Sequence, residues 1–149
     1  MSSNELKYFI CLDNYLSKEL CDSYINFYNS NLDRVYEYED SYPIILQSNE
    51  LHLIQNIIKD FNINYKLDKV EIIKRENDSI MNDHIDYGDK LSFILYLNDD
   101  YDGGETLIEN KTIIEPKTGR ILLFTNGNTM HRVNKVLNGT RFVMIGWFV

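Results

Sequence analysis

The chain of 149 residues lacks several features that would place it in other classes of protein. It contains only two cysteines, Cys11 and Cys21, which we interpret as buried small hydrophobic side chains in a reducing compartment rather than as a disulfide or a metal-binding pair. No apolar run approaches the length of a membrane span, and residues 1–5 lack the basic and apolar regions of a secretion signal. We therefore expect a cytoplasmic protein without membrane contact.

Basic residues are also scarce. The chain has 15 lysines and arginines against 23 aspartates and glutamates, which gives a formal net charge of -8. A protein that binds nucleic acid by neutralising phosphates needs clustered basic residues, so we expect no nucleic-acid partner. The chain contains no alanine and is rich in asparagine, isoleucine, lysine and tyrosine. That composition indicates an AT-rich genome, as in a virus or a low-GC microbe.

What the sequence does contain is enough apolar material for one folded domain. Hydrophobic residues make up 44% of the chain and aromatic residues 13%, which supports a hydrophobic core at this length. We predict a single domain over residues 1–149, with helical support in residues 1–67 and a β-rich core in residues 68–149. A monomer and a homodimer both stay open.

Two stretches of the N-terminal third have helical periodicity. From Ser17 to about Asn31 the apolar residues recur at three- and four-residue spacing, and Ser17 is placed to cap the first turn. A second helical pattern runs from Leu51 to Phe61. The acidic, tyrosine-rich segment between them, residues 36–42, is interpreted either as a solvated loop or as a mobile lid.

Beyond residue 68 the apolar residues are spaced by two, which is typical of strands. The residues with this spacing are Val70, Ile72, Leu91, Phe93, Leu95, Leu97, Ile121, Leu123, Phe142, Met144 and Gly146. Turn signals rich in glycine and asparagine separate these runs. Many short strands after a helical preface predict a mainly β protein with N-terminal helices, built as a closed or sandwiched antiparallel sheet.

Three residues of types that bind metals are placed on two separate predicted strands. His84 and Asp86 are two residues apart, so their side chains project from the same face of an extended strand. His131 lies far downstream, at the start of another predicted strand. Two imidazoles and one carboxylate can bind one face of ferrous iron and leave its other positions open. Zinc accepts the same ligands, so ligand type alone does not distinguish the two metals.

Arg141 lies on the next predicted strand, and the residues that follow it in this strand are mostly apolar. A guanidinium in such a strand needs a buried anion, because an unpaired buried charge is costly. Its rigid fork of donors matches a carboxylate. A dicarboxylate co-substrate would supply the anion, and a cross-strand salt bridge is the alternative.

These residues stand among short motifs whose order resembles that of a known family. The motifs are His84-Ile85-Asp86, Tyr96-Leu97-Asn98, Gly103-Gly104-Glu105-Thr106, His131-Arg132-Val133 and Gly139-Thr140-Arg141. Over residues 68–149 the chain resembles the catalytic domain of the prolyl 4-hydroxylases, which are iron(II)- and 2-oxoglutarate-dependent dioxygenases. The resemblance implies that residues 68–149 form a catalytic double-stranded β-helix of jelly-roll type, with the metal at its open end.

The resemblance also implies roles for individual residues. His84, Asp86 and His131 would bind iron(II) as the catalytic centre, and Arg141 and Tyr96 would hold the distal carboxylate of 2-oxoglutarate. Oxygen would be the second co-substrate, with ascorbate as a candidate reductant. The implied activity is hydroxylation of a substrate carbon, with a prolyl residue in a peptide or protein as the favoured substrate.

Two positions near the implied pocket complete this interpretation. Trp147 matches an aromatic residue of the pocket wall. Family members usually carry a tyrosine in the stretch before the iron-binding pair, whereas residues 74–83 of this chain contain no aromatic residue, and Arg75 or Lys74 is the candidate replacement in the substrate pocket. Two other functions stay open: a 2-oxoglutarate oxygenase acting on another substrate class, and a metal-binding jelly-roll sensor without turnover.

Overall fold

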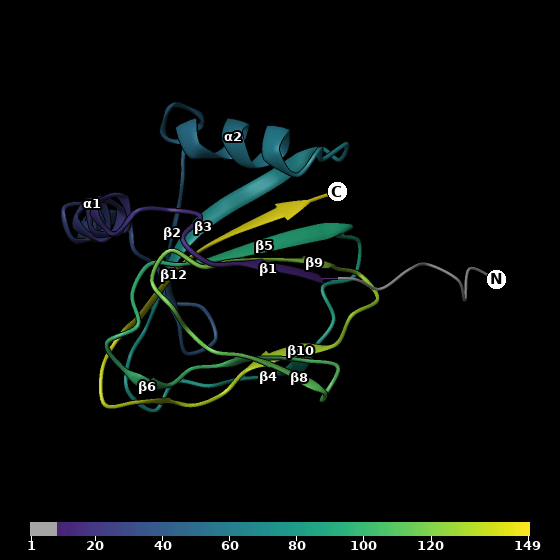
Figure 1. Ribbon diagram of the computed structural model, residues 1–149. Helices are drawn as coiled ribbons and strands as arrows, with labels where there is room; N and C mark the ends of the chain where they lie inside the picture. The colour runs from purple at the N-terminus through teal and green to yellow at the C-terminus, as the bar shows by residue number, and fades with distance from the viewer. Residues whose placement is uncertain (1–8) are drawn as a thin grey trace.

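The computed structural model describes residues 9–149. Two antiparallel sheets face each other, and two helices pack on the outer side of the larger sheet (Figure 1). The larger sheet has six strands in the order β1-β9-β5-β12-β3-β2, and the smaller has four in the order β4-β10-β7-β8. This arrangement confirms the predicted fold class, a mainly β jelly roll with N-terminal helices.

The elements have the following bounds. The larger sheet contains β1 (Phe9–Leu12), β2 (Tyr42–Ile45), β3 (Leu67–Arg75), β5 (Leu91–Tyr96), β9 (Ile121–Thr125) and β12 (Arg141–Phe148). The smaller sheet contains β4 (Met81–His84), β7 (Thr106–Ile108), β8 (Thr112–Ile114) and β10 (His131–Val133). A separate ladder pairs β6 (Asp102–Gly103) with β11 (Val136–Leu137). The helices are α1 (Lys18–Asn29) and α2 (His52–Asp60), and the 3-10 turns are η1 (Leu32–Arg34) and η2 (Ser48–Glu50).

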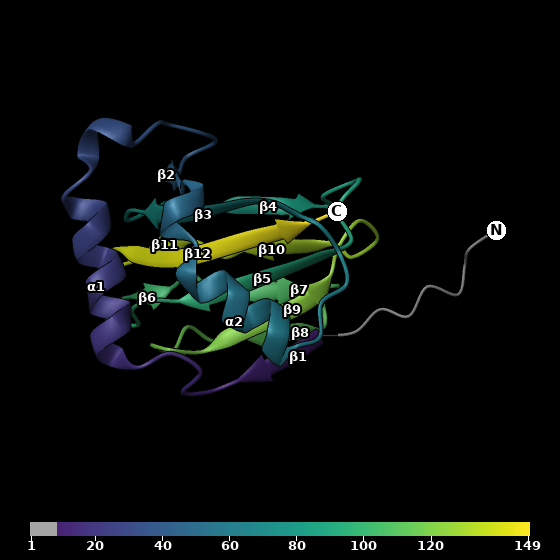
Figure 2. The same cartoon turned by 90° about the horizontal axis from the view of Figure 1, so that it is seen from above.

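Both predicted helices are confirmed. The hydroxyl of Ser17 accepts a hydrogen bond from the Leu20 amide at 3.2 Å, which caps the start of α1 as its position in the sequence predicts. Seen from above, α2 lies across the strands of the larger sheet and α1 lies near their ends (Figure 2). Within residues 9–149, neither helix is long and apolar enough to cross a membrane.

The prediction of purely helical support in residues 1–67 is incomplete, because this part also supplies β1 and β2, the two edges of the larger sheet. Neither strand has a period-two pattern that would reveal it. Three of the four residues of β1 are exposed, and β2 contains Pro43, which an edge strand tolerates because its outer side needs no donor. Cys21 is buried and free as expected, whereas Cys11, on the edge strand β1, is free but only half-buried.

The larger sheet is buried on both faces, so the side chains of β12 alternate between two environments. Phe142 and Met144 pack toward the helices, while Val143 packs between the two sheets. Gly146 also faces the helices, where a Cβ atom would lie 2.1 Å from Cε1 of Phe93. The side of β12 that carries Arg141 therefore faces the space between the sheets, where the polar residues gather.

A candidate metal and co-substrate site

The three predicted metal ligands meet at one end of the smaller sheet. β4 and β10 pair so that His84 lies opposite His131, and their ring centroids are 4.2 Å apart. Asp86 lies just beyond β4 rather than within it, so the expectation that one strand carries both His84 and Asp86 is wrong in this detail. The chain bends after β4, and this bend brings the Asp86 carboxylate to the two imidazoles.

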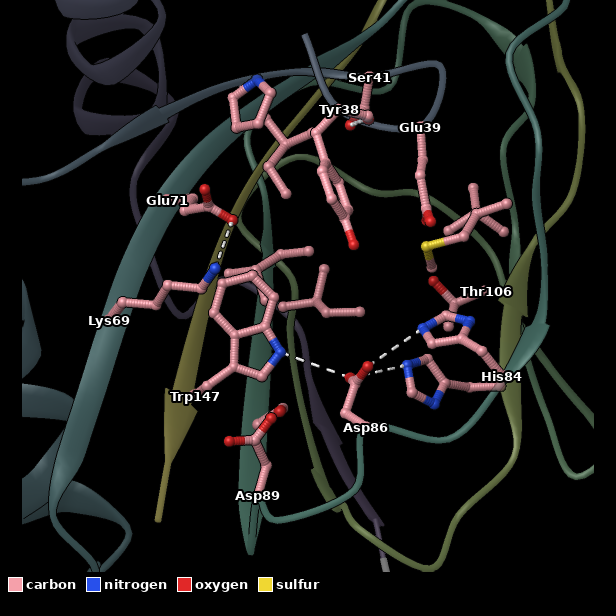
Figure 3. Close-up of a pocket in the computed structure, with 18 of the residues that line it drawn as sticks. Tyr38, Glu39, Ser41, Lys69, Glu71, His84, Asp86, Asp89, Thr106 and Trp147 are labelled. Atoms are coloured by element: carbon pink, nitrogen blue, oxygen red, sulfur yellow. Dashed lines mark hydrogen bonds and ion pairs between the residues drawn. The ribbon is translucent and has the colours of Figure 1, made fainter. Parts of the chain in front are cut away.

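The ligand atoms of the three side chains converge. Asp86 Oδ1 lies 3.4 Å from Nε2 of His84, and Asp86 Oδ2 lies 3.4 Å from Nε2 of His131 (Figure 3). One ligand atom from each residue fits within a group whose members are all within 4.8 Å of one another. Such a set provides two nitrogens and one oxygen from the protein, which suits ferrous iron with open positions.

The other nitrogen of each ring fixes the tautomer. His84 Nδ1 lies 2.9 Å from the backbone oxygen of Asn82, and His131 Nδ1 lies 3.1 Å from that of Thr129. A carbonyl oxygen can only accept, so both Nδ1 atoms must carry a proton. In its neutral form each ring would then offer the Nε2 lone pair to a metal, whereas a protonated ring donates from Nε2–H to Asp86.

Asp86 is held by donors from two further elements. The side-chain amide of Asn126 donates to Asp86 Oδ2 at 2.9 Å, and Trp147 Nε1 donates to the same oxygen at 3.4 Å. Burial by itself would raise the pKa of Asp86, but the hydrogen bonds from His131 and Asn126 and the charge of the two imidazoles lower the pKa below its ordinary value. The carboxylate is therefore ionised, as a metal ligand must be.

Asn126 and Ser92 also belong to this site, although no motif in the sequence marks them. The Asn126 side chain is 5% exposed and also donates to Ser92 Oγ at 2.6 Å, so it links Asp86 to strand β5. In the sequence Asn126 is only the first residue of a turn signal, Asn126-Gly127-Asn128. Ser92 could have been noticed in the sequence, because it is a polar residue within an otherwise apolar strand. A hydroxyl buried in β5 requires a hydrogen-bond partner inside the protein.

Trp147, on β12, lies beside Asp86. Lys69 Nζ lies 4.9 Å from the centroid of its ring and 3.7 Å from an oxygen of the buried Glu71. Figure 3 shows this group beside Asp86, with the indole between Lys69 and the metal ligands. The indole is thus packed by a cation on one side and hydrogen-bonded to Asp86 through Nε1.

Arg141 and Tyr96 also lie together, deeper between the sheets. Arg141 is 1% exposed, its Nε donates to the Gly104 oxygen at 3.1 Å, and its Cζ lies 5.6 Å from the Tyr96 ring. Within residues 9–149, Arg141 Nη2 has no hydrogen-bond partner. Tyr96 OH lies 2.5 Å from Thr106 Oγ1. A buried guanidinium nitrogen without an acceptor fits an anionic ligand, because desolvated charge is otherwise uncompensated.

One cavity of about 520 Å³ joins these groups. Of the residues singled out in the sequence, its lining includes His84, Asp86, His131, Arg141, Trp147 and Arg75. Tyr96 stands behind the lining, next to Thr106, which does reach the cavity. Lys74 points away from it, because its ammonium lies over the rings of Tyr28 and Tyr42 on the other face of β3. Of the two candidate basic residues, the structure therefore places only Arg75 in the cavity.

The acidic, tyrosine-rich segment 36–42 forms another wall of the cavity. Figure 3 shows Tyr38 and Glu39 projecting into it. Tyr38 and Ser41 exchange two backbone hydrogen bonds of 3.0 Å, and the backbone oxygen of Asp40 accepts from Ser79 Oγ at 2.6 Å. The segment thus borders the cavity, as the lid interpretation requires, and in this structure it is tied to the chain before β4.

The chain belongs to the 2OG-Fe(II) oxygenase superfamily, whose family model matches residues 70–149, more than half of the sequence. This match confirms the resemblance at the level of the family. It also includes all three residues of the metal group, Arg141, strand β5 and residues 70–75 of β3.

Curated relatives match parts of the chain. Mouse prolyl 3-hydroxylase 2 is 42% identical over 64 residues, which are 38% of this chain and 9% of that protein. A PKHD-type hydroxylase of Prochlorococcus marinus is 33% identical over 103 residues, which are 61% of this chain and 46% of that protein. The matched regions thus span less than half the length of each of these relatives.

Solved structures share the fold over nearly the whole chain. The viral collagen prolyl hydroxylase of Paramecium Bursaria Chlorella virus-1, in a 2OG complex, superposes with a TM-score of 0.81 at 23% identity and covers 95% of both chains. A prolyl hydroxylase of Trichoplax adhaerens, in complex with a peptide of hypoxia inducible factor, has a TM-score of 0.73 at 18% identity, covering 94% of this chain and 82% of that one. These likenesses establish the fold, a jelly roll with its helices on one face.

Proposed function

We propose that this protein is an iron(II)- and 2-oxoglutarate-dependent dioxygenase that hydroxylates a carbon of a prolyl residue in a peptide or protein. The observation that carries the proposal is the combination, in one cavity, of a convergent His84, Asp86 and His131 group with the buried guanidinium of Arg141, whose Nη2 has no hydrogen-bond partner among the described residues. A structural metal site would not require the second feature.

Different side chains of the protein would bind the metal and the co-substrate. His84, Asp86 and His131 would hold the iron, while Arg141 would bind the distal carboxylate of 2-oxoglutarate, with the Tyr96 hydroxyl beside it. When bound, iron(II) supplies the centre at which O2 is reduced as 2-oxoglutarate is oxidised to succinate and carbon dioxide, one oxygen atom entering succinate and the other the substrate C–H bond. Ascorbate would serve as an auxiliary reductant. The enclosing sheets would limit water at the reacting groups.

Two observations support a prolyl peptide as the substrate: the aromatic lining of the cavity and the names of the relatives given above. Tyr38 and Trp147 offer aromatic surface to an apolar ring. Glu39, Glu71 and Asp89 line the same cavity, so a neutral or basic peptide suits it better than an acidic one. We place the protein in the cytoplasm, where free cysteines persist, as a monomer or a homodimer.

The test is turnover with a library of prolyl peptides, followed by mass spectrometry. We expect succinate release that depends on iron(II) and on peptide, with a mass gain of one oxygen on a prolyl residue. His84→Ala and Asp86→Ala should abolish it. His52→Ala is the matched control, because His52 begins α2 and is exposed outside the cavity.

Other outcomes would identify other functions. An added oxygen on a residue other than proline would support a 2-oxoglutarate oxygenase of another substrate class. Binding of metal and 2-oxoglutarate with no succinate from any peptide would instead indicate a metal-binding sensor. Full turnover by His84→Ala would exclude the metal assignment altogether.

A further inference from the structure

Building on the proposed function, we infer that Arg75 is a second arginine of the co-substrate site and that it binds the distal carboxylate of 2-oxoglutarate together with Arg141. The two arginines come from neighbouring strands, β3 and β12, whose antiparallel register places the Cα atom of Arg75 opposite that of Arg141. Side chains of directly opposed residues project from the same face of a sheet and start about 5 Å apart. Both line the cavity.

The burial of the two side chains makes their arrangement unusual. Arg75 is 5% exposed and Arg141 is 1% exposed. Guanidinium groups remain charged in proteins, so this corner of the cavity contains two buried positive charges. Like charges directly opposite each other in a sheet repel, and burial leaves little water to screen them.

The hydrogen bonds of the two arginines are made with neutral groups. Arg75 Nη1 donates to Ser79 Oγ at 3.1 Å, and Arg75 Nη2 lies 3.4 Å from the sulfur of Met81, a weak acceptor. Arg141 donates to the backbone oxygen of Gly104. In the part of the chain that the structure describes, neither arginine forms an ion pair with an aspartate or glutamate.

The acidic residues nearest to Arg75 do not neutralise it. Burial is the main cause that lowers the pKa of Arg75 to about 10, and the charge of Arg141 lowers it further, while Asp40 and Glu39 act in the opposite direction. The carboxylate of Asp40 accepts a hydrogen bond from the backbone amide of Ile80 instead. The corner thus keeps a deficit of negative charge that a bound carboxylate would relieve.

This arrangement predicts how the site distinguishes acids. Because the two residues are directly opposed in the sheet and line one cavity, we expect a carboxylate that accepts from the free Nη2 of Arg141 to reach Arg75 as well. Two of the five donors of Arg75 are used by Ser79 and Met81. An oxo acid without a distal carboxylate would leave both charges uncompensated. Arg75 should therefore contribute to affinity for 2-oxoglutarate and not for a 2-oxo monoacid of equal length.

The experiment compares binding of 2-oxoglutarate and 2-oxopentanoate to the Mn(II)-loaded protein by titration calorimetry without oxygen turnover. We expect Arg75→Gln to weaken 2-oxoglutarate binding by roughly 10-fold to 100-fold, the loss of one charge-assisted hydrogen bond, and to leave 2-oxopentanoate binding nearly unchanged. Lys74→Gln is the matched control. It removes the same charge from the adjacent residue of β3, whose side chain lies on the opposite face, and should change neither affinity.

The affinity of each variant for Mn(II) is measured in parallel and shows whether its cavity is intact. If Arg75→Gln does not fold, Arg75→Lys replaces it, because lysine keeps the charge but lacks the forked donors, and its 2-oxoglutarate affinity should fall below that of the parent protein. Unchanged 2-oxoglutarate affinity in the folded Arg75 variant, with a loss in Arg141→Gln, would overturn this inference and leave the proposed function standing. Failure of the parent protein to bind 2-oxoglutarate would overturn both.

Discussion

His84 and His131 lie directly opposite each other on β4 and β10, with their ring centroids 4.2 Å apart and each Nδ1 hydrogen-bonded to a backbone oxygen two residues earlier in the chain. This pairing means that one strand ladder sets the position of both rings. The backbone hydrogen bonds then set which nitrogen faces Asp86. The metal ligands are thus placed mainly by the main chain, and only the carboxylate depends on side-chain contacts.

Metal should therefore stabilise the folded protein. An ion that binds only the folded state at 100 times its dissociation constant adds about 2.7 kcal/mol to the free energy of unfolding. We expect Mn(II) to raise the melting temperature, and a chelator to reverse the change. The measurement is a thermal melt of the parent protein, His131→Ala and His52→Ala. An equal rise in His131→Ala would show that the ion binds elsewhere.

Asn126→Ala should weaken metal binding although Asn126 is not a ligand. The substitution removes the shorter of the two hydrogen bonds from Asn126 and Trp147 to Asp86 Oδ2 and leaves Ser92 Oγ without this partner. Loss of such a supporting hydrogen bond typically reduces metal affinity by about 10-fold to 100-fold. Titration with Mn(II) measures the effect, and Asn64→Ala, at an exposed position, is the control. Equal affinities in the two variants would mean that Asp86 does not need this support.

Gly146→Ala should destabilise the fold without touching the cavity. The added methyl group would lie 2.1 Å from Cε1 of Phe93 and 2.8 Å from its Cζ, so the buried ring must move. Overpacking of this kind costs about 1–3 kcal/mol. Urea unfolding should show this loss, with Mn(II) affinity unchanged below the transition. A variant as stable as the parent would show that the ring relocates freely.

The ion pair between Asp13 and Arg120 should make stability depend on pH. The hydrogen bond from Arg120 Nε, at 2.6 Å, is the main cause that lowers the pKa of Asp13 from 3.8 to about 2, with a smaller contribution from Lys117. A lowered pKa gives stability that is complete above the unfolded value and is lost as the pH falls through the folded value. The stability difference between the parent and Asp13→Asn should therefore shrink from about pH 4 to about pH 2. Urea titrations across that range measure it, and a constant difference would contradict the assignment.

Much of the fold could be predicted because its strongest signals are local. The spacing of apolar residues predicts both helices and the strands β3, β5, β9 and β12, whose buried faces require it. β1 and β2 escaped prediction because edge strands gain their structure from pairing with β9 and β3, and pairing leaves no periodic pattern in an exposed strand.

The candidate site also has a part that could be predicted from the sequence and a part that could not. The types and order of His84, Asp86 and His131 indicate a metal group, and the structure brings them together. The contact of Asn126 with Asp86 and the pairing of Arg75 with Arg141 depend on which distant segments become neighbours, and short local patterns do not contain that information. The exact place of Asp86 was missed for a related reason, since its partners Asn126 and Trp147 come from distant parts of the chain.

The two-sided burial of β12 has a practical consequence for engineering. Successive positions of this strand serve separate purposes, so a mutant library can vary the cavity-facing Ile145 to alter which molecules are accepted, while Met144 and Gly146 stay fixed to preserve folding and Trp147 stays fixed to hold Asp86. Substitutions at neighbouring positions of β12 can then change substrate selectivity and folding stability separately.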